Sequence, residues 1–311
     1  NTILINGDDL TALVRANMDK FQFKQEDMEE MDKTVKSNPK AFWFGSPETP
    51  DEVQSYINER IDNAKSNLAD DTSLSDADFE RLRKLVESYP QNLRTRLGND
   101  MVAKIPPMVI HLKDGCEPKR VKLYPMKPSA RQQMDQSVDE LERASLIEPN
   151  ARSTWCASAQ MVPKPGGKPG EMRMVIDYKW LNACTVPIQG SMPILQDEFR
   201  NIQGAKYFFS ADFLKGFWQC DLDKDSQHLL SFMIPKGVYM PLKIPQGAVD
   251  SPLYFHNQIA RIFKDLINEK KMLLWVDDVL IFAKTWDEYL ALVKRFLDLC
   301  VENNLQVNIK K

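Results

Sequence analysis

The sequence has few of the residues that build thiolate, imidazole or disulfide sites. Its 311 residues include three histidines and five scattered cysteines, with no C-x-x-C pair. This scarcity disfavours a zinc site, and an odd, scattered set of cysteines is typical of a protein kept in a reducing compartment. We therefore expect an intracellular protein, cytoplasmic or nuclear, that is not secreted.

Long hydrophobic runs are also missing. No apolar stretch approaches the roughly 20 residues that cross a bilayer, and no secretory leader is visible, so we expect no membrane partner. Hydrophobic residues make up 43% and charged residues 27%, which excludes a wholly disordered chain. The chain begins at Asn1 rather than Met, and we expect it to be a piece of a longer one.

Charge divides the chain near residue 105. Residues 1–105 carry 14 Lys+Arg and 20 Asp+Glu, a net of −6, whereas residues 106–311 carry 27 and 24, a net of +3. I-P-P at residues 105–107 is a natural boundary between the two parts. The mildly basic second part is compatible with a polyanionic partner.

The acidic first part contains two helix-start patterns. T-P-D-E at residues 49–52 has the form of a capping box with proline at the first helical position, and apolar residues follow it at helical spacing. A second start lies at Ser75, and Pro90 marks its end. We predict a mostly helical region over residues 1–105, whose role stays open.

Residues 106–311 mix strand-like and helical patterns. One helix is predicted from Ser129 to about Ile147, and two more begin at Ser251 and Thr285. The order of elements predicts an α+β domain in which helices cover one face of an antiparallel sheet. Strand-like runs lie at residues 108–112, 154–162, 172–176, 206–211, 272–276 and 279–283.

Two adjacent carboxylates separate the last two apolar runs. Asp277 and Asp278 stand between M-L-L-W-V and V-L-I-F-A, where a two-residue hairpin turn ordinarily carries Asn-Gly or Asp-Gly. Like charges held side by side repel each other, and a divalent cation is the simplest compensation. The doublet is therefore either a metal-binding turn or an exposed tight turn.

A third carboxylate ends an earlier strand. Asp212 follows Y-F-F-S-A at residues 207–211 and lies 65 residues before the doublet, which leaves room for an excursion containing a helix. Three carboxylates from two strand ends could hold two Mg²⁺ ions about 3.5–4 Å apart, the geometry of two-metal phosphoryl transfer. The plain alternative for Asp212 is a strand-end cap.

A hairpin with basic flanks is predicted around residues 164–170. Its sequence, K-P-G-G-K-P-G, lacks the residue order of a phosphate-binding loop. A turn centred between Lys168 and Pro169 would place Lys164 directly opposite Arg173, where the two charges repel. A bound triphosphate would convert that repulsion into attraction. The alternative is a pair of long basic side chains on an exposed hairpin.

Four segments, taken in order, resemble the reverse transcriptase of gypsy-type LTR retrotransposons. W-V-D-D at residues 275–278 is similar to the Y-x-D-D box, with Trp275 in place of the usual tyrosine. S-A-D-F-L-K-G-F-W-Q at residues 210–219 resembles L-D-L-x-x-G-Y-x-Q. P-Q-G at residues 245–247 and S-P-L-Y-F at 251–255 resemble the nucleotide-side motif, and R-M-V-I-D-Y-K-W-L-N at 173–182 resembles the fingers motif.

The resemblance implies a right-hand polymerase fold. Fingers are expected at about residues 106–203 and a palm at about 204–311, with an antiparallel palm sheet backed by helices and a mostly helical region before them. We identify no thumb, RNase H or integrase segment in the sequence.

The resemblance also implies roles for the acidic residues. Asp212 and Asp277 would bind the two catalytic metal ions, and Asp278 would support them. The expected ions are two Mg²⁺, or Mn²⁺ in their place.

Further roles concern the incoming nucleotide. Lys164 and Arg173 would contact its triphosphate, and Gln246 and Gly247 would line its pocket. The ring of Phe217 would block a ribose 2′-hydroxyl; the alternative is a core phenylalanine.

The implied function is that of an RNA-directed DNA polymerase of a retroelement. Its partners would be an RNA or DNA template with a primer and deoxynucleoside triphosphates, in a cytoplasmic particle or the nucleus. The alternative is a catalytically inactive, retroelement-derived fragment that binds nucleic acid or another partner. The sequence does not indicate an oligomeric state.

Overall fold

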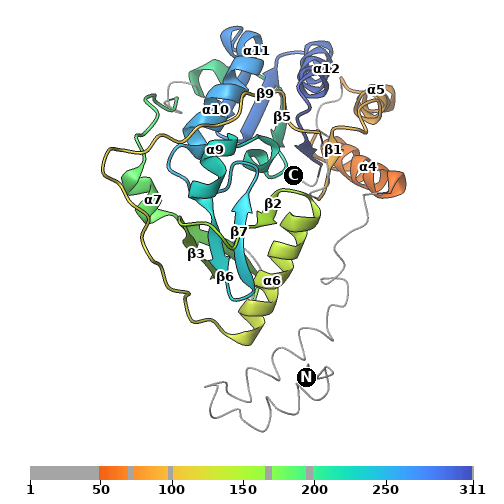
Figure 1. The fold of residues 1–311 in the computed structure, drawn as a ribbon. Coiled ribbons are helices and arrows are strands. Elements are labelled where there is room, and N and C mark those ends of the chain that lie inside the picture. The colour runs from red at the N-terminus through yellow and green to blue at the C-terminus, as the bar shows by residue number, and fades with distance from the viewer. Residues whose placement is uncertain (1–48, 69–72, 97–100, 165–169, 194–198, 310–311) are drawn as a thin grey trace, which may run out of the picture.

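The structure is a computed structural model that describes residues 49–68, 73–96, 101–164, 170–193 and 199–309. Residues 1–48 of the predicted N-terminal region and the predicted hairpin tip at 165–169 lie outside the described residues. The described chain forms sheets of three, five and two strands with helices packed beside them (Figure 1). None of the described helices is both long and apolar enough to span a lipid bilayer.

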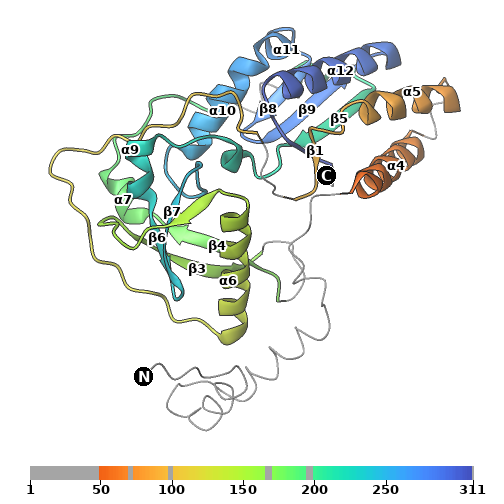
Figure 2. The same ribbon diagram turned by 45° about the vertical axis from the view of Figure 1, so that its right-hand side comes forward.

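The three-stranded sheet is antiparallel and has helices on one face (Figure 2). Side chains alternate between the faces of a strand, so Tyr207 and Ala211 are buried under the helices while Phe208 and Ser210 are exposed on the other face. The predicted antiparallel sheet backed by helices is therefore confirmed. The sheet order is β5 (Tyr207–Asp212), β9 (Asp278–Ala283), β8 (Met272–Trp275), and the helices are α10 (Ser251–Ile262), α11 (Lys264–Asn268) and α12 (Trp286–Glu302).

The five-stranded sheet is mixed rather than wholly antiparallel. Its neighbouring strands β3 and β6 run parallel, and a long excursion through other elements connects them. Helix α6 (Pro128–Arg143) packs against this sheet, burying Met134 and Val138 completely. The sheet order is β2 (Ile147–Pro149), β7 (Gly237–Pro241), β6 (Phe232–Ile234), β3 (Ala157–Pro163), β4 (Met172–Asp177).

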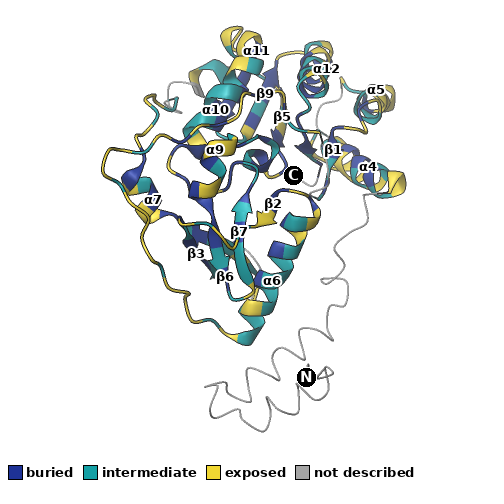
Figure 3. Ribbon diagram, in the orientation of Figure 1, coloured by how far each residue is buried: buried dark blue, intermediate teal, exposed yellow. Residues whose placement is uncertain are grey.

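Short helical segments connect these strands. Helix α7 follows β4 directly, and the remaining segments lie before or after β5. Figure 3 shows that buried residues concentrate where helices meet the sheets. The segments are α7 (Lys179–Cys184), η2 (Phe199–Ile202), η3 (Gly216–Gln219), α9 (Lys224–Gln227) and η4 (His228–Leu230).

Two sequence predictions of secondary structure are corrected. The helix from Ser129 ends at Arg143 rather than near Ile147, because Ser145 adopts a positive φ of 55° and Ile147 begins β2. Residues 108–112 form isolated bridges to Leu222 and Thr185 instead of a strand.

Both predicted N-terminal helices are present. Helix α4 (Pro50–Asn67) starts at a capping box in which Thr49 and Glu52 bond each other's backbone N–H groups, and α5 (Asp76–Glu87) starts at Ser75. Their apolar faces are buried, and the ring of Phe79 lies 5.5 Å from that of Trp286 on α12.

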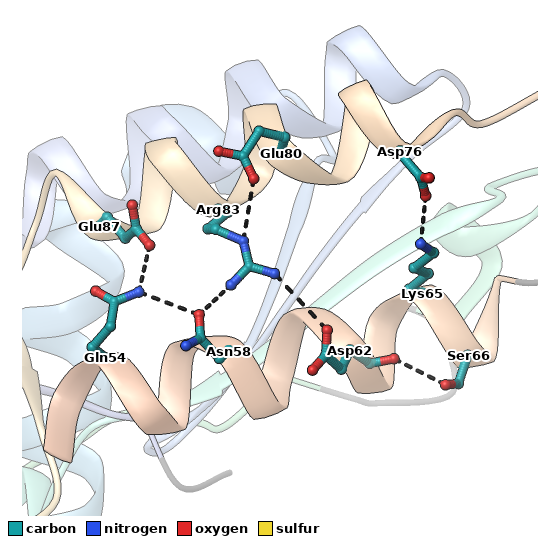
Figure 4. Close-up of polar contacts among 9 residues, drawn as sticks. All are labelled: Gln54, Asn58, Asp62, Lys65, Ser66, Asp76, Glu80, Arg83 and Glu87. Atoms are coloured by element: carbon teal, nitrogen blue, oxygen red, sulfur yellow. Dashed lines mark hydrogen bonds and ion pairs between the residues drawn. The ribbon is translucent and has the colours of Figure 1, made fainter. Parts of the chain in front are cut away.

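A polar seam joins α4 to α5 (Figure 4). Arg83 is central to it: its side chain lies 3.3 Å from Glu80 and 3.9 Å from Asp62, and it donates to Asn58. Exposed ion pairs of this kind contribute about 0–1 kcal/mol each, so the buried apolar faces contribute most of the attachment. The seam also contains the pairs Gln54–Asn58, Gln54–Glu87 and Lys65–Asp76.

A two-stranded parallel sheet ties the segment after α5 to the end of the chain. Strand β1 (Leu93–Arg94) pairs with β10 (Val307–Asn308). The buried side chain of Asn92 donates to the carbonyls of Cys300 (3.2 Å) and Leu305 (2.8 Å). Residues 92–94 are thus built into the same unit as β10, although they precede the boundary predicted near residue 105.

We expect Asn92→Ala to destabilise this connection. The substitution removes the side-chain donor to the buried carbonyl of Leu305, while the carbonyl of Cys300 keeps the backbone N–H of Leu305, and losing such a donor costs about 1–3 kcal/mol of unfolding free energy. Chemical denaturation followed by circular dichroism measures the loss. Asn63→Ala, at an exposed position on α4, should leave stability unchanged, and an equal loss in both variants would contradict the assignment.

Candidate active site

Strand register places two of the three predicted carboxylates face to face. Asp212 ends β5, and Asp278 begins β9 as its direct antiparallel partner. Directly opposed residues share a face of the sheet, with Cβ atoms about 4.5–5.5 Å apart. This is the face of Phe208 and Ser210, opposite the helices. The register therefore brings together two acidic residues that lie far apart in the sequence, Asp212 and Asp278.

Asp277 lies beside this pair in the β8–β9 turn. The backbone N–H of Phe213 donates to the carbonyl of Asp277 (3.3 Å), which ties the turn to the residue after Asp212. Asp212 is 7% exposed, whereas Asp278 is exposed. The buried carboxylate of Asp212 therefore lies beside two carboxylates that are more accessible to solvent.

The turn differs by one residue from the sequence prediction. Trp275 pairs with Asp278, so the two turn residues are Val276 and Asp277 rather than Asp277 and Asp278. Val276 takes a φ of 56°, which is costly for a β-branched residue. Asp278 belongs to the six-residue pairing of β9 with β5, which places it in the strand rather than in the turn. The strained turn presents Asp277 at the end of the hairpin.

Strand β10 borders the carboxylates on another side. Asn308 donates through Nδ2 to Oδ2 of Asp212 (3.3 Å). The backbone N–H of Leu214 donates to the carbonyl of Gln306 (3.0 Å), and Phe213 forms a bridge with Val307. The segment after Asp212 is thus laid against β10.

Gln219 fastens the same two segments together. Its amide donates to the carbonyls of Leu214 and Gln306, both at 2.9 Å, and accepts from the N–H of Gln306 at 2.8 Å. Gln219 belonged to the recognised motif but carried no role in the sequence analysis. The signal for Gln219 in the sequence was that it matches the glutamine of the family motif.

The donor chemistry of the three carboxylates suits a hard divalent cation. Mg²⁺ takes oxygen ligands, usually one or two carboxylates together with substrate phosphates and water. Directly opposed like charges such as those of Asp212 and Asp278 are destabilising by themselves, and a cation between them would relieve this. Among the residues that the structure describes, no three His, Cys, Asp or Glu side chains already converge as a metal-binding group.

The predicted nucleotide-side loop is held by α7. Asn182 donates to the carbonyl of Gly247 (2.9 Å) and accepts from the N–H of Val249 (2.9 Å), while Gln246 stays exposed. Gly247 has a φ of 106°, and a Cβ there would lie 3.3 Å from the carbonyl of Ile176. The position therefore requires glycine. Asn182 was not among the predicted site residues, although it ends the fingers motif.

The predicted opposition of Lys164 and Arg173 is wrong. Strands β3 and β4 pair so that Arg173 faces Val162, and Lys164 instead forms an ion pair with Glu171 (2.5 Å). The observed pairing is shifted by two residues from the predicted one, since Arg173 faces residue 162 rather than residue 164. The two cations are diagonal neighbours on one sheet face, and both are exposed.

Phe217 lies on η3, five residues after Asp212. It is half-buried, and its ring centroid is 5.3 Å from that of Phe255 in an edge-to-face arrangement. Phe255 is fully buried on α10. One side of Phe217 thus packs on the core, and the other is accessible.

Comparison with known proteins identifies the family. Residues 162–311 match the sequence model of the family described as reverse transcriptase (RNA-dependent DNA polymerase). The chain is 32% identical over 196 residues to the enzymatic polyprotein of cauliflower mosaic virus (strain Strasbourg), covering 62% of this chain and 28% of that protein. It is 29% identical over 197 residues to the retrovirus-related Pol polyprotein from transposon opus of Drosophila melanogaster, covering 63% and 19%.

Solved structures share the fold. A foamy viral protease-reverse transcriptase in complex with an RNA/DNA hybrid matches with a TM-score of 0.73 and 22% identity, covering 89% of this chain and 36% of that one. The same kind of protein in complex with double-stranded DNA matches with a TM-score of 0.72 and 23% identity, covering 86% and 52%. The predicted fingers–palm fold is confirmed. The chain spans less than a third of the length of the curated relatives named above. Residues 162–311 therefore form a reverse transcriptase domain, homologous to those of retrotransposon Pol polyproteins.

Proposed function

We propose that this chain is the fingers–palm part of an RNA-directed DNA polymerase of a retroelement. The observation that carries the proposal is the register that sets Asp212 opposite Asp278, with Asp277 in the adjoining turn, on the sheet face opposite the helices. Fingers would extend over about residues 106–203 and the palm over about 204–311. We also propose that the retroelement is of the gypsy type.

In this proposal the carboxylates hold the catalytic ions. Asp212 and Asp277 would bind two Mg²⁺ ions, or Mn²⁺ in their place, with Asp278 in support. When bound, such ions activate the primer 3′-hydroxyl and stabilise charge on the α-phosphate and the departing pyrophosphate. The protein's own contribution is to fix the carboxylates through β5, β9 and β10, so that reacting groups meet in a defined geometry.

The fingers would hold the incoming deoxynucleoside triphosphate. Arg173 can make bidentate contacts with phosphate, and Lys164 can supply a further charge if a triphosphate displaces Glu171. Gln246 and Gly247 would line the pocket, with Asn182 fixing their loop.

The template–primer would be held mainly through its backbone. The relatives solved with an RNA/DNA hybrid and with double-stranded DNA support a nucleic-acid partner of this shape. Binding should show little sequence preference and weaken as salt concentration rises.

Primer extension tests the proposal directly. The full chain is incubated with poly(rA)/oligo(dT), dTTP and Mg²⁺ or Mn²⁺, and binding to the same template–primer is measured in parallel. Extension supports the polymerase. Binding without extension at any metal concentration would instead favour an inactive nucleic-acid-binding fragment.

We expect Phe217→Val to admit ribonucleotides. A smaller side chain leaves room for a 2′-hydroxyl, and a change in pocket size of this kind alters discrimination by about 10–200-fold. The ratio of kcat/KM for dTTP to that for UTP measures it. Phe217→Tyr keeps the ring and should keep the wild-type ratio. An unchanged ratio in Phe217→Val would show that Phe217 is a core residue without a role in sugar discrimination.

A further inference from the structure

The amide of Asn308 contacts the most buried of the three carboxylates. Its Nδ2 donates to Oδ2 of Asp212 at 3.3 Å, and it comes from a strand 96 residues further along the chain. Asn308 is half-buried, and Asp212 is 7% exposed. A neutral donor of this kind orients a carboxylate without neutralising its charge, so the oxygens keep their affinity for a cation.

The strand that carries Asn308 is fixed from both sides. On one side, the N–H groups of Val307 and Ile309 donate to the carbonyls of Asn92 (2.7 Å) and Arg94 (3.0 Å) on the β1 side. On the other side, the three hydrogen bonds of the Gln219 amide join residue 306 to the segment that follows Asp212. The position of Asn308 relative to Asp212 is thus set by backbone pairing and not only by its own side chain.

The two-residue strand β10 is held by hydrogen bonds on both sides, and such a strand is well suited to position the side chain of Asn308. The β8–β9 hairpin ends in a strained turn at Val276, and the loop after Asp212 has a left-handed residue at Lys215. The backbone of both segments that carry the carboxylates is therefore constrained, and β10 lies beside Asp212 as a third such segment. Removing a residue that hydrogen-bonds to a metal ligand and orients it typically lowers metal affinity or activity by about 10–100-fold.

We propose that Asn308 is a positioning residue that orients the Asp212 carboxylate for cation binding, and that residues 92–94 hold it in place through β10. This inference rests on the proposed function, because it takes Asp212 as a metal ligand. It extends the catalytic unit beyond the recognised motifs, to a strand at the end of the described chain and to a segment before the predicted fingers.

The test measures cation binding itself. Free Mn²⁺ is followed by electron paramagnetic resonance during titration of the full chain bound to template–primer. Asn308→Leu, similar in volume but without a donor, should weaken Mn²⁺ binding by about 10–100-fold and raise the metal concentration for half-maximal extension by a similar factor. The Kd for template–primer should not change.

Further variants keep the result interpretable. Asn308→Ala removes the donor without adding an apolar group, so it decides the matter if Asn308→Leu fails to fold. Asn308→Gln retains an amide donor and should lose less affinity than Asn308→Ala. Asn303→Ala loses a comparable bond, to the carbonyl of Leu299 (2.9 Å), away from the carboxylates, and should bind Mn²⁺ like the wild type.

The outcomes separate this inference from the function on which it rests. If Asn308→Ala is folded and binds Mn²⁺ within about twofold of the wild type while Asp212→Asn does not bind, only the positioning role is overturned. If Asp212→Asn itself binds Mn²⁺ and extends primers normally, the proposed metal site fails, and the positioning role with it. A lower melting temperature in Asn308→Ala with unchanged Mn²⁺ affinity would show a merely structural residue.

Discussion

Asp277→Asn should abolish primer extension, lowering kcat by about 10³-fold, because the amide that replaces the carboxylate is a weak ligand for a hard cation. The turn that carries Asp277 is held by backbone pairing of β8 with β9, so the substitution should leave the fold intact. Template–primer affinity should be retained. Single-turnover extension and fluorescence anisotropy measure the two quantities.

A matched control is the same substitution at an exposed helix position. Asp225→Asn, on the short helix α9, removes one negative charge with the same change of shape and should extend primers like the wild type. Extension by Asp277→Asn within about tenfold of the wild type would refute the assigned metal site, since loss of an essential ligand costs far more.

Phe255→Ala should be among the most destabilising single substitutions, at about 3–5 kcal/mol. Phe255 is completely buried, and its ring centroid lies 6.0 Å from that of Phe213 and 5.3 Å from that of Phe217. A Cβ on Gly216 would lie only 2.7 Å from this ring, so the backbone after Asp212 rests directly on it. Activity should fall together with stability.

Urea unfolding monitored by tryptophan fluorescence measures this loss. Phe208→Ala removes the same side chain at a position that is 48% exposed on β5, and it should cost about 1 kcal/mol or less because little buried area is lost. A similar loss in both variants would show that Phe255 does not support the site as described.

Local patterns determined much of the architecture. The capping box at residues 49–52 predicted the start of α4, and apolar runs predicted β5, β8 and β9, because hydrogen bonding at helix ends and alternation in strands act over a few residues. The four ordered motifs were enough to indicate the reverse transcriptase family, which the comparisons confirm.

Register was decided only by tertiary structure. The predicted pairing of Lys164 with Arg173 and the predicted turn at Asp277 and Asp278 were each shifted, since the turn sequence alone specifies the pairing of its flanking strands poorly. In the β8–β9 hairpin, pairing with β5 outweighed the poor fit of Val276 to a positive φ.

The surroundings of the carboxylates also needed the folded chain. The sequence determined which acidic residues are available and the family to which they belong. Only long-range packing could bring Asn308 to Asp212 and strand β1 to β10, because contacts between residues some 100 to 200 positions apart leave no local pattern. Such contacts depend on the free energy of the whole fold, which no short segment encodes.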